Sequence, residues 1–327
     1  MIFDFEKVKI ILKLNLKLIF EVDIVIVCYL CKKKFSMLSI DPKEIAPAKL
    51  QGYLQSAVAP RPIAFASTMD SNGNPNLSPF SFFNVFSSNP PILIFSPARR
   101  VRDNTTKHTL INAQNTKEVV INVVNYDIVQ QMSLSSTEYP DGVNEFEKAG
   151  FTMLKSDKVK PFRVAESPVQ FECKINDVIA LGDQGGAGNL VICEVVKIHI
   201  NEAVLDATGM IDQHKIDLVA RMGGNWYSRS NVGMFEVEKP LTTLGVGVDM
   251  IPDFIKESSY FNGNDLGKLG NIENIPTEEE IAIFVKENFE VKAVLSSDDM
   301  DTKFQKAKEY VDNGRAIDAW KLLLAKK

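Results

Sequence analysis

The segment from residue 60 to residue 124 consists of short apolar runs separated by turn-forming residues. Three runs have the length of a strand: residues 63–68, 92–96 and 119–124. The first is followed by residues 70–74, in which an Asn-Gly pair supplies the positive φ angles that a tight hairpin needs. This pattern predicts antiparallel strands joined by short connections.

A second block of strands follows, because apolar residues occupy every other position in residues 171–175 and again in 191–195. The segment between them, residues 181–189, is rich in glycine. A glycine-rich loop that binds a dinucleotide must open a helix, whereas a strand follows here. We therefore interpret this loop as a hairpin connection and Cys173 and Cys193 as core thiols. Strands at this density predict a mostly β fold, as a closed or partly closed antiparallel barrel.

The C-terminal part has a different pattern. A loop-rich connection is expected from Gly245 to Pro276, followed by a helix that Thr277 caps and that runs to about Asn288. Residues 299–325 are expected to form one or two further helices, with the break at Gly314. Residues 241–327 are therefore predicted to be a linker and a helical extension, attached to a β domain at residues 37–240.

Residues 1–36 contain no Gly, Pro, Ala, Arg or Thr, and they carry seven Lys and four acidic residues. These charges interrupt the apolar run before it reaches the roughly 20 residues that span a membrane, and the segment lacks the pattern of a secretory signal. Cys28 and Cys31 have the spacing of half a metal site but no second pair. A/T-rich upstream DNA read in frame encodes such a composition. We expect translation to start at Met37 and residues 1–36 to be a disordered or untranslated extension without a packing role.

Charge and residue counts exclude several function classes. The net charge of −5 becomes −8 for residues 37–327, which opposes binding to nucleic acid. The chain has three His, and none lies in a nucleophile motif or in a zinc-hydrolase pattern, so we assign neither a catalytic residue nor a metal site. His199 ends an apolar strand and is interpreted as structural. Four Cys in 327 residues favour a reducing compartment, the cytoplasm.

Basic and hydroxyl residues gather where a helix is expected at residues 104–112, with Asn104 or Thr105 as its N-cap. Backbone N–H groups, the helix dipole and forked guanidinium donors favour a phosphate at such a place. The residues concerned are Arg99, Arg100, Arg102, Thr105, Thr106, Lys107 and Thr109. A solvated basic turn explains the composition about equally well, so these residues alone leave both interpretations open.

An aromatic and polar mixture at residues 79–84 favours the phosphate interpretation. In one extended strand, Phe80 and Phe82 would face one side while Ser81 and Phe83 face the other. Such a surface suits a flat, partly polar ring system. The chain has 20 Phe, and five of them lie between residues 80 and 95. A phosphate clamp beside an aromatic slot indicates a nucleotide-like cofactor.

The sequence GNPNLSPFSFFN at residues 73–84 resembles the signature of the flavin reductase-like proteins, which have the FMN-binding split barrel and include flavoredoxins. Residues 107–112 are similar to their Lys-Asp-Thr-x-x-Asn helix start, and residues 118–122 to the strand that follows it. Residues 221–227 are similar to their late Arg-x-Gly-Gly-x-x-Tyr element. The resemblance covers about residues 47–238, and His108 stands where the family usually has Asp.

This resemblance implies a split β-barrel of Greek-key type and a homodimer that binds FMN noncovalently near the subunit interface. Carried over position by position, the residues that would line the ring and ribityl chain are Ser67, Thr68, Ser81, Phe82 and Phe83. Those that would hold the phosphate are Arg102, Thr106, Lys107 and Thr109.

The function that the resemblance implies is an NAD(P)H-dependent flavin reductase, which passes electrons from NADH or NADPH through FMN to free flavin or to another acceptor, such as an acceptor protein. The sequence has no nicotinamide fingerprint, so this co-substrate would stack on the flavin. Two alternatives remain open. One is a flavoredoxin-like electron carrier without nicotinamide activity, and the other is a barrel that lost its ligand and serves as an interaction module. Neither nucleic acid nor a membrane is an expected partner.

Overall fold

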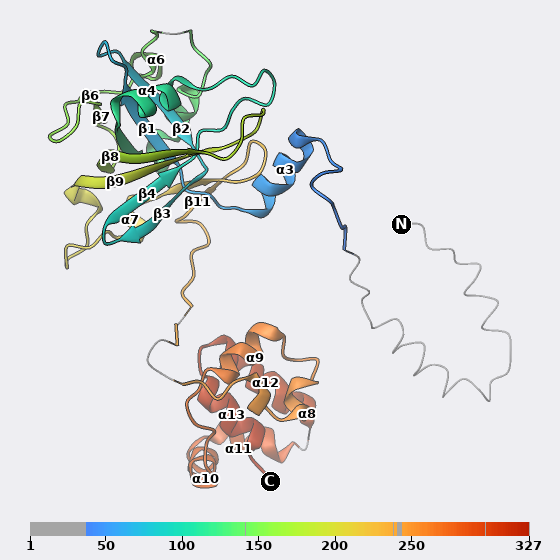
Figure 1. The fold of residues 1–327 in the computed structure, drawn as a ribbon. Helices are drawn as coiled ribbons and strands as arrows, with labels where there is room; N and C mark the ends of the chain where they lie inside the picture. The colour runs from blue at the N-terminus through green and yellow to red at the C-terminus, as the bar shows by residue number, and fades with distance from the viewer. Residues whose placement is uncertain (1–36, 141, 238, 241–243, 298, 327) are drawn as a thin grey trace. The chain divides into compact units, whose positions relative to one another are not determined.

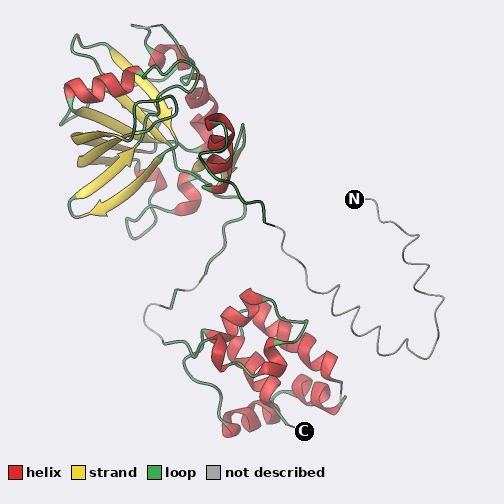
Figure 2. Cartoon of the chain, turned by 45° about the vertical axis from the view of Figure 1, so that its right-hand side comes forward, coloured by secondary structure: helices red, strands yellow, loops and turns green. Residues whose placement is uncertain are grey.

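The computed structural model describes residues 37–140, 142–237, 239–240, 244–297 and 299–326 (Figure 1). The expectations for residues 1–36, Cys28 and Cys31 included, lie outside the described residues. The chain divides into two compact units between Met234 and Phe235. Figure 2 shows that the sheet belongs to the first unit and that the second is built of helices. In the described part of the chain, no helix combines the length and the apolar character needed to cross a membrane.

The first unit is built on one seven-stranded sheet in which every pairing is antiparallel, in the order β2-β1-β5-β8-β9-β4-β3. The strands are β1 (Ala64–Met69), β2 (Pro75–Phe80), β3 (Phe83–Ser88), β4 (Pro91–Phe95), β5 (Glu118–Val123), β8 (Val169–Ala180) and β9 (Asn189–Ile200). Two small hairpins pair β6 (Met153–Leu154) with β7 (Arg163–Val164) and β10 (Val219–Arg221) with β11 (Tyr227–Arg229). The predicted mostly β, antiparallel fold is confirmed.

Short helices join and cover these strands. They are α3 (Pro47–Ala57), α4 (His108–Thr116), α5 (Val129–Leu134), α6 (Glu145–Ala149) and α7 (Gln213–Ile216), with 3-10 turns η1 (Tyr126–Ile128) and η2 (Glu202–Val204). The helix predicted at residues 104–112 begins later than expected, at His108, so the proposed caps are wrong. Asn104 has a left-handed φ of 57°, and the Thr105 hydroxyl donates to Asp103 Oδ1 instead of capping a helix.

The prediction of one continuous strand through residues 79–84 is also wrong. Strand β2 ends at Phe80 and β3 begins at Phe83, with a bend at Ser81 and Phe82 between them. Phe80 is buried against Phe95, with ring centroids 5.3 Å apart, and Phe83 packs on the same core. Because the bend breaks the alternation, the phenylalanines divide between the core and the surface, where Phe82 lies.

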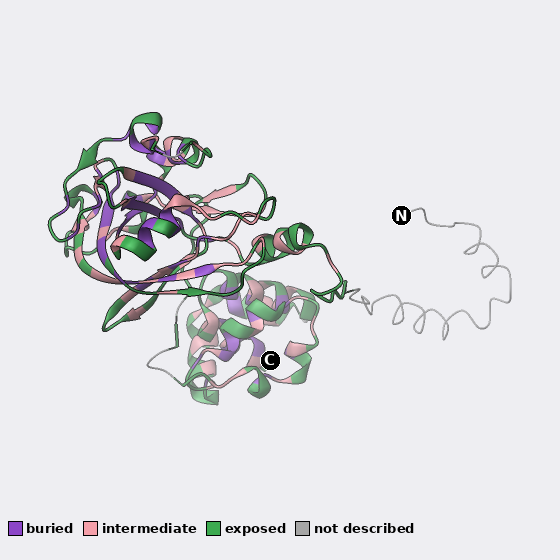
Figure 3. Cartoon of the chain, turned by 45° about the horizontal axis from the view of Figure 1, so that its top comes forward, coloured by how far each residue is buried: buried purple, intermediate pink, exposed green. Residues whose placement is uncertain are grey.

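Two hydrophobic cores lie on opposite faces of β1, because its successive side chains alternate between them. Ala66 joins one core, which contains Phe95 and the two thiols Cys173 and Cys193. Phe65 joins the other core, together with side chains of β2, α5 and α6. Figure 3 shows the buried segments running along the strands of this sheet. Both thiols are free and buried, so their prediction as core residues is confirmed.

The second unit has its own core, in which Trp320 is fully buried and donates its indole N–H to the Leu269 carbonyl at 2.8 Å. Its helices are α8 (Asp253–Lys256), α9 (Gly263–Gly270), α10 (Glu278–Glu287), α11 (Phe289–Ser296), α12 (Met300–Asp312) and α13 (Ala316–Leu324), preceded by the turn η3 (Val248–Met250). The helix predicted after Thr277 is confirmed, since Thr277 forms a capping box with Glu280. Gly314, with a φ of 73°, separates α12 from α13 as predicted.

The connection predicted to be loop-rich between Gly245 and Pro276 contains η3, α8 and α9 instead. Asn262 and Asp265 form a capping box that starts α9, and Leu269 of that helix and Ile255 of α8 are buried. These helices are too short to show several helical periods, so their stability comes from packing in the core rather than from local pattern.

Candidate functional site

The first turn of α4 opens onto a solvent-accessible cleft, here called the Lys107 cleft. Two carboxylates, Glu138 and Glu145, lie among hydroxyl, amide and basic side chains. The lining residues are Asn76, Ser78, Arg100, Lys107, His108, Thr109, Ser135, Ser136, Thr137, Glu138, Tyr139 and Glu145. Strand β2, the start of α4 and the segment after α5 therefore meet at this cleft.

A buried polar network holds the first turn of α4 in place. Thr109 Oγ1 donates to Asn76 Oδ1 at 2.7 Å, and Asn112 Nδ2 donates to Thr68 Oγ1 at 3.2 Å. Thr68 Oγ1 in turn lies 3.3 Å from Asn76 Oδ1, which it reaches as a donor. The hydroxyls of Thr68 and Thr109, both predicted site residues, thus face this network and link α4 to β1 and β2. They fix the position of Lys107, which immediately precedes the helix.

Lys107 is the side chain of the cleft with an uncompensated charge. Its ammonium lies 3.5 Å from Ser78 Oγ and 4.9 Å from the centroid of the Phe80 ring. It makes no ion pair with any residue that the structure describes. Burial and the neighbouring Arg100 lower the pKa of Lys107, an effect that Glu138 and Glu145 oppose. A half-buried cation without a counter-ion suits an anionic ligand.

The arginines beside it already have partners, which for Arg100 and Arg102 include carboxylates. Arg99 donates to Asn104 Oδ1 at 2.6 Å, and Arg100 donates to Glu138 at 3.0 Å and to the Thr106 carbonyl at 3.0 Å. Arg102 is 70% exposed at its side chain and pairs with Asp103 and with Glu138 at 3.0 and 2.9 Å. Hydrogen bonds from Arg102 and Arg100 hold the pKa of Glu138 below its ordinary value.

The glycine-rich loop between β8 and β9 is a hairpin connection, as predicted, and it supports this arginine segment. A Cβ on Gly185 would lie 3.0 Å from the carbonyl oxygens of Arg100 and Val101. Asn104 Nδ2 also donates to the Asp183 carbonyl at 2.9 Å. Glycine at residue 185 therefore lets the two backbones approach closely and sets the shape of the cleft wall.

Ser81 lies at a second place, next to a buried arginine. The Arg61 guanidinium reaches Ser81 Oγ at 3.4 Å through Nε, and donates to the carbonyls of Gln55, of Val58 at 2.8 Å and of Met222 at 2.9 Å. Arg61 is only 6% exposed, and burial and the nearby Arg221 lower the pKa of its guanidinium. Residue 81 is thus tied to the end of α3 and to the β10–β11 hairpin.

The structure brings some of the predicted residues together and separates others. Thr68, Thr106, Lys107 and Thr109 lie around the start of α4, and Arg102 joins this group through Glu138. Ser81 and Phe82 lie at the bend, where Ser81 contacts Arg61.

Ser67 faces the opposite side of β1 from Thr68, and its buried Oγ has no hydrogen-bond partner among the described residues. Sequence reasoning did not assign Asn76, Ser78, Glu138 or Arg61 to the site, although Asn76 and Ser78 lie within the signature at residues 73–84. The alternation of Asn76 and Ser78 along β2 is a local signal that could have identified them, whereas Glu138 and Arg61 have no such signal.

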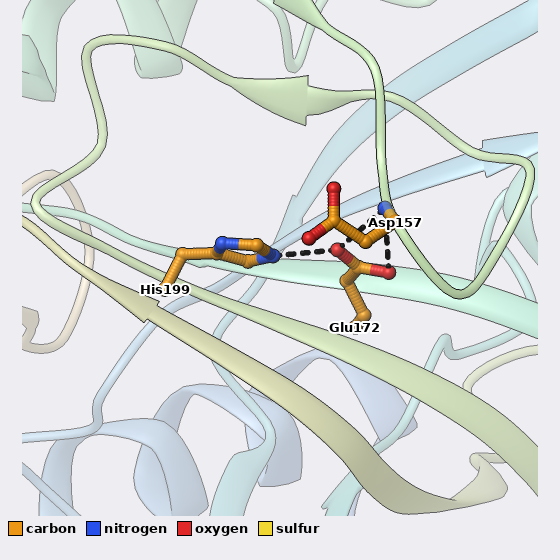
Figure 4. A group of neighbouring side chains, drawn as sticks. All are labelled: Asp157, Glu172 and His199. Atoms are coloured by element: carbon orange, nitrogen blue, oxygen red, sulfur yellow. Dashed lines mark hydrogen bonds and ion pairs between the residues drawn. The ribbon is translucent and has the colours of Figure 1, made fainter.

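A second charged group, here called the Glu172 cluster, consists of Asp157, Glu172 and His199 (Figure 4). Figure 4 shows the His199 ring pointing at the Glu172 carboxylate. The distance between His199 Nε2 and Glu172 Oε1 is 2.6 Å. The backbone N–H groups of Asp157 and Lys158 donate to the same carboxylate at 2.9 and 2.6 Å. Burial raises the pKa of Glu172, but these hydrogen bonds outweigh it and hold the pKa below its ordinary value.

The ligand atoms of the Glu172 cluster lie within 4.8 Å of one another, a spacing that a metal ion could use. However, Lys197 pairs with Asp157, and Arg163 lies 4.0 Å from Glu172. A divalent cation would have to displace or face these positive groups. The arrangement accounts for His199 as a structural side chain that joins β9 to β8.

The family model described as "Flavin reductase like domain" matches residues 56–217, which lie in the first unit. An uncharacterised protein of Aquifex aeolicus is 38% identical over 173 residues, covering 53% of this chain and 86% of the relative. One of Halalkalibacterium halodurans is 34% identical over 205 residues, covering 62% of this chain and 97% of the relative.

Solved structures show the same architecture. Nitrilotriacetate monooxygenase component B from Bacillus cereus is 28% identical, with a TM-score of 0.58, and covers 62% of this chain and 99% of its own. 2-nitrobenzoate 2-nitroreductase from Pseudomonas fluorescens is 23% identical, with a TM-score of 0.57 over 64% of this chain and 100% of its own. A protein with a split barrel domain from Shewanella frigidimarina is 24% identical, with a TM-score of 0.53 over 63% of this chain and 100% of its own. The first unit is therefore a split β-barrel.

Proposed function

Since the chain belongs to the flavin reductase-like family, we propose that it binds FMN and passes electrons from NADH or NADPH through it to free flavin or another acceptor. Family membership supports a flavin-related oxidoreductase. We further propose that the flavin is FMN, that the electron donor is NADH or NADPH, and that the acceptor is free flavin or another acceptor. Bound FMN would supply reversible redox chemistry. The residues of this chain would bind it, orient it and place positive charge beside its phosphate.

The observation that carries the proposal is the uncompensated ammonium of Lys107. Leaving a half-buried cation without a counter-ion costs free energy, which a bound phosphate would offset. Ser78 Oγ lies beside the ammonium, and the first N–H groups of α4 lack acceptors within their own helix. The residues present therefore fit the phosphate of FMN, with Lys107, Ser78 and Thr106 holding it. Thr68 and Thr109 would act through Asn76 by fixing the start of α4.

The ring of FMN would lie toward the bend at residues 81–83. Phe82 is partly exposed there, and Ser81 is held by Arg61, so the bend offers an apolar edge and a hydroxyl in a fixed place. Arg102 would act as a more distant charge, since it already has carboxylate partners. The role of Ser67 in binding FMN stays a prediction, since its hydroxyl is buried on the other side of β1 from Thr68.

We propose that a second copy of this chain completes the protein as a homodimer. Helix α3 has 11 residues and none of them is buried, although Tyr53 and Leu54 are apolar. A helix of that length is marginal in water by itself, and contacts that bury none of its residues add little, so a further partner surface is favoured. Strand β3 lies at one end of the sheet with Val85 and Phe86 exposed by 64% and 63%. Uncovered apolar edge strands invite association.

We also propose a cytoplasmic location, which the free thiols of Cys173 and Cys193 support.

The absorbance spectrum of the purified full chain, taken with and without added FMN and then after anaerobic NADH or NADPH, tests the function. We expect FMN to bind and its flavin bands to bleach with at least one nicotinamide. Bound FMN that bleaches only with dithionite or a partner protein would establish the electron carrier instead. A colourless protein that does not bind added FMN would favour the interaction module.

The solution mass, measured by light scattering, tests the homodimer. We expect twice the chain mass for the wild type and a single chain for Phe86→Glu.

A further inference from the structure

The β10–β11 hairpin carries a guanidinium that the proposed FMN site does not use. Arg221 lies opposite Tyr227 in the register of the two strands, and its guanidinium carbon stacks 4.6 Å from the centroid of the Tyr227 ring. Among the described residues, the guanidinium N–H groups of Arg221 have neither a hydrogen-bond acceptor nor a carboxylate partner. The stack fixes the guanidinium plane and leaves its donors available for a ligand.

A second guanidinium lies in the same neighbourhood. Arg61 and Arg221 are paired through their backbones, each N–H donating to the other's carbonyl at 2.9 Å. The Arg61 side chain is bound by carbonyls and by Ser81, and none of the described carboxylates pairs with it. Two cations are therefore grouped without a counter-ion. Such a grouping is unfavourable by itself and becomes favourable when an anion binds.

The hairpin is held in a defined position against α3. A Cβ on Gly223 would overlap Ser56 Oγ, so the backbone approaches helix α3 as closely as only glycine permits. Arg61 Nη2 also donates to the Met222 carbonyl, which joins the hairpin to the Arg61 side chain. Because Arg61 contacts Ser81 as well, the hairpin is anchored next to the bend where the flavin ring is expected.

The same hairpin presents a flat aromatic ring to solvent. Trp226, in the turn between the two strands, is 76% exposed, and its backbone closes the turn with Met222 and Gly223. An exposed indole is a platform on which a nucleobase can stack. A guanidinium without a counter-ion and an exposed indole in one short hairpin are the two contacts that a nucleotide needs.

We propose that the β10–β11 hairpin binds the pyrophosphate and adenosine part of the nicotinamide dinucleotide, with Arg221 donating to a phosphate oxygen and Trp226 stacking on the adenine. This inference rests on the proposed function and extends it to the recognition of the electron donor. It accounts for nicotinamide use without a dinucleotide-binding fold. The FMN phosphate has its own cation at Lys107, so the two phosphate sites are separate.

Binding of ADP-ribose, which has the pyrophosphate and adenine but no redox-active ring, tests the proposal by calorimetry on the full chain. We expect Arg221→Met to weaken ADP-ribose binding at least tenfold and Trp226→Ala to weaken it severalfold. Arg229→Met is the matched control, because Arg229 lies on the same hairpin but is paired with Asp217 at 2.6 Å and stacked on Tyr126. Its ADP-ribose affinity should stay within about twofold of the wild type. Absent binding by the wild type, or equal losses in both arginine variants, would overturn the proposal.

The rate of flavin bleaching by two donors separates this proposal from the proposed function. NADH carries the pyrophosphate, whereas 1-benzyl-1,4-dihydronicotinamide does not. Arg221→Met should slow bleaching by NADH at least tenfold at low donor concentration and leave bleaching by the benzyl compound unchanged. An equal slowing with both donors would mean that Arg221 acts on the flavin and would contradict the inference. A wild type that binds FMN and ADP-ribose but is not bleached by NADH would refute only the proposed function. Trp226→Ala, at an exposed position, keeps the test valid if Arg221→Met does not fold.

Discussion

The Glu172 cluster and the Lys107 cleft lie on the same barrel and use the same kinds of residue, yet their charges are arranged in opposite ways. Glu172 is fully buried, and backbone N–H groups, His199, Arg163 and Lys197 surround its cluster. Lys107 is half-buried and has Ser78 and an aromatic ring beside it. In the first region the charged groups contact one another directly. In the second, Lys107 makes no ion pair with a described residue, although Glu138 and Glu145 line the same cleft.

Structural charges and binding charges differ in whether the protein itself provides their partners. A compensated buried cluster contributes to the stability of the fold, and removing one member leaves others unpaired. An uncompensated cation lowers stability slightly and is retained where a ligand provides the missing charge. His199 belongs to the first kind, and we propose that Lys107 and Arg221 belong to the second.

The largest expected effect is on stability at the Glu172 cluster. Glu172→Ala should lower the free energy of unfolding by about 3–5 kcal/mol, because it leaves His199 and two backbone N–H groups without their acceptor. Denaturant unfolding measures this. Glu172→Gln, which keeps an acceptor oxygen, should lose less. If Glu172→Ala unfolded like the wild type but lost a bound metal, the cluster would be a binding site and the comparison would fail.

At the Lys107 cleft the expected effect is on binding rather than on stability. Lys107→Ala should weaken FMN binding by about 1.5–3 kcal/mol, the scale of a charge-assisted hydrogen bond, while the unfolding free energy changes little. Titration followed by flavin fluorescence measures the affinity. An FMN affinity equal to that of the wild type would move the phosphate site elsewhere.

The pH dependence of FMN binding also tests the role of the Lys107 ammonium. Burial lowers the pKa of Lys107 below 10.5, so its ammonium loses the proton at a lower pH than an ordinary lysine. FMN affinity should therefore fall as pH rises through that lowered pKa, by up to about tenfold per pH unit above it. Unfolding free energy should change in the opposite direction in the absence of FMN, since the unfolded chain then holds more protons. Lys107→Arg should abolish the fall in affinity over the same range, which rapid titrations at several pH values can check.

The smallest effect is expected at Arg102. Its charge is exposed and already paired with Asp103 and Glu138, so Arg102→Ala should weaken FMN binding only about two- to threefold. Titration with FMN at low and at high salt measures the affinity of Arg102→Ala and of Lys107→Ala under the same conditions. A loss as large as that of Lys107→Ala would show that compensation does not separate the two kinds of charge.

Much of the barrel follows from local pattern. Strands β1, β4, β5, β8 and β9 lie where short apolar runs predict them, and Gly314 and Thr277 mark helix ends as expected. The errors concern places where tertiary contacts decide. Asn104 does not cap α4 because the Arg99 side chain and the Asp183 carbonyl bind its side-chain amide. Helices α8 and α9 form because Ile255 and Leu269 pack in the core that contains Trp320.

The sequence by itself determined which residue types are available for a phosphate and a flat ring, since Lys107, Ser81 and Phe82 belong to motifs that can be read along the chain. Only the tertiary structure decided which of these charges lack a counter-ion. Glu138 reaches Arg100 and Arg102 from a segment more than 30 residues away, and Arg61 meets Arg221 across 160 residues of chain. The physical reason is that compensation depends on distance in space. Local sequence specifies strands and caps through contacts between near neighbours, whereas the balance of charge in a site is set by side chains that the fold brings together.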